Sequence, residues 1–99
     1  MFTTTDPQGR PVELTTRSYT DHILVEHPDM SDVDEIELAI RMPEVIAQDA
    51  IDPERTVYYR TYQCRPQRWM LKVVIEAGEV VTAYRVSRMK QGETVLWRA

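Results

Sequence analysis

Two histidines, His22 and His27, are the only side chains of this sequence that ordinarily titrate near neutral pH. Their segment predicts a helix, on which His22 and Glu26 are four residues apart and lie side by side. A neighbouring carboxylate can fix the tautomer of an imidazole, which suits a general acid or base. The same pair also fits a solvated surface contact. His27, just before Pro28, also fits a cap on the free carbonyls of the helix end.

A second set of candidates comes from the strands expected in the C-terminal half. If Leu71 and Val73 face the core, alternation along the strands brings four other side chains together on the open face: Arg60, Lys72, Thr82 and Tyr84. Cations beside a phenol and a hydroxyl can hold a phosphodiester and stack a base, because guanidinium grips phosphate oxygens as a fork and the tyrosine ring is flat. Tyrosine and threonine are also ordinary strand residues, so packing alone explains them as well.

Other kinds of site find little support. Two histidines five residues apart do not share a helix face, and the acidic run Asp32–Glu37 fits the start of a helix better than a cation site. Cys64 has no resolving cysteine and is interpreted as a bystander thiol. The three glycines stand alone, so no phosphate-binding glycine loop is present. We therefore expect no metal and no cofactor.

The elements that must position these groups follow from the hydrophobic period. The first half predicts a helix over Thr16–Glu26, stopped by Pro28, and a second that opens at Ser31–Asp34. Pro43–Gln48 can begin another helical turn. Ahead of them, the turn at Asp6–Pro11 predicts a small hairpin of Phe2–Thr5 and Val12–Thr15, or merely an ordered arm.

After residue 55 the period changes to two, which predicts strands joined by short links: Thr56–Gln63, Trp69–Ala77, Glu79–Arg88 and Glu93–Arg98. Consecutive strands with short links make an antiparallel meander. The expected fold class is α+β, with two to three N-terminal helices packed on a four-stranded antiparallel sheet.

Composition sets the frame for this fold. A chain of 99 residues with 42% hydrophobic residues and one cysteine fits a single domain, residues 1–99, stabilised by an ordinary apolar core. Neither a secretion signal nor a membrane span is expected, which favours a cytoplasmic setting.

The charges are unevenly distributed along the chain. Residues 1–54 carry three basic against thirteen acidic residues, and residues 55–99 carry nine against three. A cationic surface and an anionic partner are one interpretation, and mutual neutralisation across the fold is the other.

Several segments together resemble the small bacterial and phage domains grouped as barnase/EndoU/colicin/RelE-like nucleases, over nearly the whole chain. The segments that carry the resemblance are Asp6–Thr15, Asp21–Met30, Met42–Ile46, Val57–Arg60, Val73–Ile75, Val80–Tyr84 and Leu96–Trp97. The resemblance implies helices on a RelE-like or barnase-like sheet and a metal-independent cleavage of RNA. It also implies a toxin that acts with an antitoxin or immunity-type protein partner.

The resemblance implies a role for each candidate in an endoribonuclease that forms a 2′,3′-cyclic phosphate. His22 would be the general base or acid, Arg60 would hold the phosphorane, Tyr84 would stack or donate a proton, and Thr82 would bind phosphate. The RNA backbone would be guided by Lys72, Arg85, Arg88 and Lys90. Secondary candidates are His27, Glu26 and Tyr58.

A competing hypothesis keeps the scaffold without the chemistry. The chain would then be a noncatalytic protein- or RNA-binding regulatory module, with its sheet surface or the acidic stretch Asp29–Glu37 facing the partner. The position of His22 relative to Arg60 distinguishes the two, because acid–base chemistry on one phosphate needs both groups at one cleft.

Overall fold

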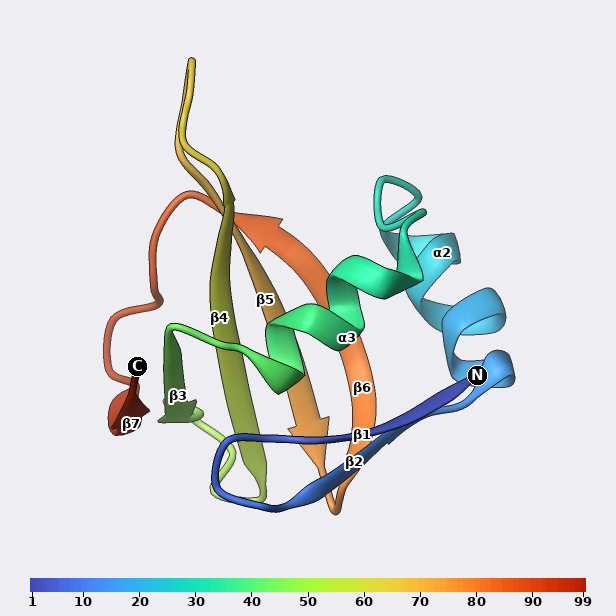
Figure 1. Cartoon of the computed structure of the whole chain (residues 1–99), viewed down its shortest axis with the longest axis horizontal. Coiled ribbons are helices and arrows are strands. Elements are labelled where there is room, and N and C mark those ends of the chain that lie inside the picture. The colour runs from blue at the N-terminus through green and yellow to red at the C-terminus, as the bar shows by residue number, and fades with distance from the viewer.

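The computed structural model describes residues 1–99 as a seven-stranded mixed sheet with two helical segments (Figure 1). The strand order is β1-β2-β6-β5-β4-β3-β7. Neighbouring strands are antiparallel except β2 and β6, which are parallel and meet only at Glu13 and Glu79. The strands are β1 (Phe2–Thr5), β2 (Pro11–Leu14), β3 (Val45–Gln48), β4 (Arg55–Gln63), β5 (Trp69–Glu76), β6 (Glu79–Val86) and β7 (Thr94–Arg98).

Each helical segment begins with a side-chain cap, close to where the sequence predicts the helix to start. The Thr15 hydroxyl accepts a hydrogen bond from a backbone N–H of the first turn, and the Asp32 carboxylate does the same for the second segment. No helix in the structure combines the length and the apolar composition needed to cross a bilayer. The first segment consists of α1 (Thr16–Ser18), the π-helical η1 (Tyr19–Ile23) and α2 (Leu24–Glu26), and the second is α3 (Val33–Arg41).

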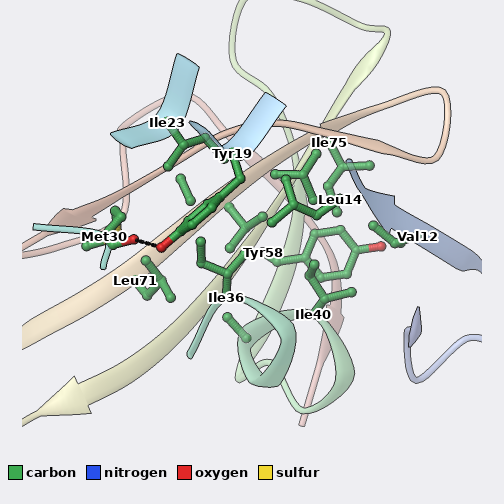
Figure 2. Close-up of a cluster of buried hydrophobic side chains, with 14 of the residues drawn as sticks. Val12, Leu14, Tyr19, Ile23, Met30, Ile36, Ile40, Tyr58, Leu71 and Ile75 are labelled. Carbon is green, nitrogen blue, oxygen red and sulfur yellow. Dashed lines mark hydrogen bonds between the residues drawn. The ribbon is translucent and has the colours of Figure 1, made fainter. Parts of the chain in front are cut away.

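The main core lies between the helices and one face of the sheet, called here the helix face. Fifteen buried residues form it, among them Ile36 and Ile40 from α3 and Leu71 from β5 (Figure 2). The Tyr19 hydroxyl donates a hydrogen bond of 2.6 Å to the Met30 carbonyl inside this core. This bond ties the first helical segment to the loop before α3.

The opposite side, called here the second face, carries a smaller core of six buried residues. They are Val45, Ala47, Val57, Tyr59, Met70 and Val74. The segment of residues 87–93 passes from the end of β6 to β7 and covers part of this face: Met89 packs against the cluster, and the Lys90 backbone N–H donates to the Tyr59 hydroxyl. Figure 1 shows this segment leaving β6 and descending beyond β4 to β7.

The predicted fold class, two to three helices on a four-stranded antiparallel sheet, is wrong, because the structure is mostly sheet and its sheet is mixed. Pro43–Gln48 does not begin a helix. Its apolar residues form β3, which is hydrogen-bonded to β4 on one side and β7 on the other. A short apolar run buried between two strands has the same sequence signature as a helical turn.

The predicted meander is also wrong at its last strand. β4, β5 and β6 are consecutive neighbours, but β7 leaves β6 and pairs with β3 at the far edge of the sheet. The link between β6 and β7 is therefore a crossing segment rather than a tight turn. Burial of Met89 and Glu93 on the second face holds this crossing in place. The small N-terminal hairpin, β1 with β2, is present.

Candidate nucleic-acid interface

Three predicted site residues share the second face. Strand register places Tyr59, Lys72 and Tyr84 in one row across β4, β5 and β6. The Lys72 ammonium lies 5.4 Å from the centre of the Tyr59 ring and 5.9 Å from that of Tyr84. Thr82 lies in the next row on the same face, opposite Val74. Alternation along the strands thus places Lys72, Thr82 and Tyr84 together, as expected.

His27 joins this row from the first helical segment. Its ring stacks on Tyr84, with centres 5.1 Å apart and planes at 26°. The backbone leaves the helical conformation at His27, and β2 pairs with β6 only at Glu79, so no strand covers β6 beside Tyr84. Figure 1 shows the helical segment lying along this flank of β6. The secondary candidate His27, rather than His22, therefore meets the predicted strand residues.

Lys72 is buried and engaged by an acid that the sequence did not suggest. Its Nζ lies 2.8 Å from an Oε of Glu93, and the Tyr59 hydroxyl donates to the other Oε. Burial by itself would lower the pKa of the Lys72 ammonium, but Glu93 and Tyr59 outweigh burial and raise the pKa above its ordinary value. Burial, followed by the bond to Glu93, raises the pKa of Tyr59. Lys72 is thus a charged group without access to an outside ligand while Glu93 is in place.

The Thr82 hydroxyl is the only buried side-chain polar atom that lacks a hydrogen-bond partner. A buried hydroxyl without a partner costs free energy that a bound acceptor would recover. This observation keeps Thr82 as a candidate for binding phosphate oxygens.

Arg60 and His22 do not converge. Arg60 lies on the helix face, and its guanidinium donates to the Met42 carbonyl at 2.8 Å. His22 lines a shallow hollow beside Val81, and its Nδ1 lies 3.6 Å from Glu26. Arg60 on β4 is in register with Arg85 on β6, two strands away. Val81, which lies beside His22, precedes Arg85 on β6, so it is roughly 13 Å from Arg60 along the strands and about 10 Å across the sheet. The predicted clamp and base therefore face different parts of the protein.

Two further predicted residues are occupied by structural contacts. Arg85 pairs with Asp29 at 3.1 Å and lies over the Trp69 ring at 4.9 Å, on the helix face. Tyr58 is buried, and its hydroxyl donates to Asp6, whose carboxylate also holds the turn of the N-terminal hairpin. Both side chains are thus engaged within the protein in this conformation.

Four exposed cations gather on the second-face side of β7 and of the β4–β5 hairpin. We call them the cationic surface: Arg68, Arg88, Lys90 and Arg98. The three arginines line one hollow of about 300 Å³, and Arg88 extends it toward Lys90. None of the four makes an ion pair with an acid.

One acid shares this hollow, but it is engaged elsewhere. The Glu44 carboxylate accepts hydrogen bonds from the Thr61 backbone N–H and hydroxyl. Guanidinium groups around a hollow bind phosphate oxygens as forks, so the cationic surface can hold a polyanion.

Arg88 and Lys90 were expected to contact nucleic acid, whereas Arg68 and Arg98 were not. Arg98 joins them only because β7 crosses to β3, and strand placement of that kind has no local sequence signal. The only sequence feature that pointed to this cationic surface was the excess of basic residues from position 55 onward.

The chain was compared with family models, with curated proteins and with solved structures, and no match was found. The structure itself defines the class: a small domain with a seven-stranded mixed sheet, helices on one face, and a cationic surface on the other side. The resemblance to barnase/EndoU/colicin/RelE-like nucleases stays a prediction.

Proposed function

We propose that this chain is an RNA-binding module that holds single-stranded RNA on the cationic surface of its second face. The observation that carries this proposal is that Arg68, Arg88, Lys90 and Arg98 gather around connected hollows and that none of them forms an ion pair with an acid. By contrast, the strand cations Arg55, Lys72 and Arg85 are each paired with an acid. We further propose that the module meets its RNA in the cytoplasm.

Single-stranded RNA fits this face better than a duplex. The half-buried rings of Tyr84 and His27 lie on the same face as Lys90, linked to it through Lys72 and Tyr59. Aromatic rings beside a basic groove bind single strands, because unstacked bases can lie on the rings while the phosphates follow the cations. A duplex hides its bases from such rings.

The test is fluorescence anisotropy with a labelled single-stranded RNA in EDTA. We expect the double substitution Arg88→Gln and Arg98→Gln to weaken binding at least tenfold. The matched control changes the same charge at two exposed arginines off this face, Arg17→Gln and Arg41→Gln, and should leave affinity within twofold. Equal losses in both variants would overturn the proposal, and tighter binding of DNA than of RNA would redirect it.

A second candidate, a metal-independent endoribonuclease, is favoured by the stacked His27 and Tyr84 rings beside Thr82. In this version His27 takes the proton of a ribose 2′-hydroxyl, and the oxygen attacks the adjacent phosphorus. The bond from phosphorus to the 5′-oxygen breaks, which leaves a 2′,3′-cyclic phosphate and a 5′-hydroxyl. Tyr84 protonates the leaving oxygen, and Arg88 replaces Arg60 as the cation near the phosphate.

Cleavage is tested by incubating the same RNA with the protein in EDTA and then separating the RNA by size. New 5′-hydroxyl ends that appear in EDTA and disappear in His27→Gln, but persist in His22→Gln, would support cleavage at the second face. Intact RNA under conditions of saturated binding would leave the noncatalytic module as the function.

If the chain is a toxin, its neutralising partner should carry a basic segment. Asp32 and Glu35 line a hollow of about 200 Å³ on the helix face, together with Asp29, which is paired with Arg85. Opposite charge favours association there. Asp32→Lys with Glu35→Lys should then abolish neutralisation and leave RNA binding unchanged, whereas unchanged neutralisation would exclude this surface.

A further inference from the structure

The Glu93 carboxylate occupies a small site built from buried donors. The Glu93 side chain is fully buried, and the Lys72 side chain is 4% exposed. The Lys72 ammonium and the Tyr59 hydroxyl each contact a different oxygen of the carboxylate. An ammonium and a phenol that converge on adjacent oxygens of one anion are a donor set equally suited to a phosphate.

A third donor occupies a neighbouring position on the same face, and the carboxylate does not use it. Thr82 lies diagonally across from Lys72 on β6, one row from the Tyr59–Lys72–Tyr84 row. Diagonal neighbours on one sheet face are about 7–8 Å apart, within reach of a long side chain. The Thr82 hydroxyl is buried and has no partner. A carboxylate offers two oxygens, whereas a phosphodiester in the same place offers acceptors in more directions.

The segment that precedes Glu93, residues 87–92, makes few contacts with the rest of the protein. Residues 87–92 form no helix or strand, and all except Met89 are exposed. Gly92, immediately before Glu93, has a φ of +92°, in the left-handed region that glycine tolerates best. Glu93 precedes β7, whose pairing with β3 begins at Thr94. The carboxylate can therefore leave its site by a change at Gly92 and Glu93 without any loss of strand pairing.

We propose that Lys72, Tyr59 and Thr82 form a phosphate-binding site that Glu93 fills in the free protein and that an RNA phosphodiester fills in the complex. The identity of the ligand as RNA rests on the proposed function, but the anion site itself does not. Glu93 then acts as an internal competitor: RNA drawn in by Arg88 and Lys90, which are on the same segment, displaces it. In this way Lys72, predicted from the sequence to bind RNA, becomes available only after the displacement.

The first test uses inorganic phosphate and Glu93→Gln, which keeps the shape of the side chain and removes its charge. At constant ionic strength, we expect phosphate to bind this variant at least tenfold more tightly than the wild type, as measured by calorimetry. The control adds Lys72→Gln, which makes the pair neutral on both sides and should abolish phosphate binding. Weak binding by folded Glu93→Gln, or binding that survives Lys72→Gln, would overturn the site.

If Glu93→Gln does not fold in chloride, the same variant is tested for recovery of folding in phosphate. Recovery in phosphate, but not in chloride at equal ionic strength, supports the site, and equal behaviour in both salts overturns it.

The wild type provides the second test. On addition of a ribo-oligonucleotide, the NMR signal of the Glu93 carboxyl carbon should move to the position of a solvent-exposed glutamate, because the carboxylate leaves Lys72 and Tyr59, while the amides of β3 stay protected from exchange. Bound RNA with an unchanged Glu93 carboxyl signal overturns the displacement and leaves the proposed function intact. Phosphate binding by Glu93→Gln without any RNA binding by the wild type overturns the proposed function and leaves the anion site intact.

Discussion

The salt dependence of RNA binding follows from the number of free cations on the second face. Each phosphate neutralised on a single strand contributes about −0.7 to the slope of log affinity against log salt concentration. With one phosphate for each of Arg68, Arg88, Lys90 and Arg98, and with Lys72 still paired with Glu93, the slope is about −2.8. Affinity should then fall roughly 50-fold between 50 and 200 mM salt.

Removal of one cation should change this slope by a fixed amount. Arg88→Gln should reduce it to about −2.1, so the loss over the same salt range becomes roughly 20-fold. Arg85→Gln is the matched control on the same strand end, because Arg85 is already paired with Asp29 on the helix face. Anisotropy titrations at four or more salt concentrations give both slopes. Equal slopes for the wild type and Arg88→Gln, or an equal change in Arg85→Gln, would refute the reasoning.

Three further predictions concern stability. Asp6→Ala should lower the free energy of unfolding, measured by urea denaturation, by about 3 kcal/mol. The reason is that the Asp6 carboxylate accepts hydrogen bonds from Gln8, Arg10 and the buried Tyr58 hydroxyl. A loss under about 1 kcal/mol would contradict this. Ala77→Gly should raise the free energy of unfolding by about 0.5 kcal/mol, because Ala77 has a φ of +52°, a conformation that glycine adopts with less strain. The measurement is the midpoint of thermal unfolding, and an unchanged or lower midpoint would argue against strain at Ala77. Burial would raise the pKa of Asp6, but hydrogen bonds from Tyr58 and Arg10 outweigh burial and lower the pKa. The stabilisation that the ionised Asp6 gives the folded state is therefore complete above the unfolded pKa of about 3.9 and is lost as pH falls through the folded pKa. The urea midpoint should consequently drop less in acid for Asp6→Ala than for the wild type.

The sequence was most informative where one element carries its own pattern. The helix starts near Thr16 and within Ser31–Asp34 and the small N-terminal hairpin are local signals, and the structure contains all three. β3 and β7 depend instead on partners far along the chain. Val45–Gln48 is too short to show a period, and β7 reaches it through long-range contacts, with Trp97 packed on the main core and Met89 on the second face.

The candidate site divides in the same way. Alternation within β5 and β6 was sufficient to place Lys72 and Tyr84 on one face. Arg60 was placed wrongly, because both alternating sets of β4 contain tyrosines and only the register, with Tyr58 opposite Val73, shows which set faces the helices. The π-helical turn at Tyr19–Ile23 departs from the 3.6-residue period, so the helix face of His22 could not be read from spacing.

The central claim, that RNA lies on the cationic surface of the second face, is tested most directly by mapping of backbone amide chemical shifts during titration with a single-stranded RNA. The account predicts the largest changes at Arg68, at residues 87–91 and at Arg98, with small changes along α3. Largest changes around His22 or Arg60, or no changes at all, would contradict it.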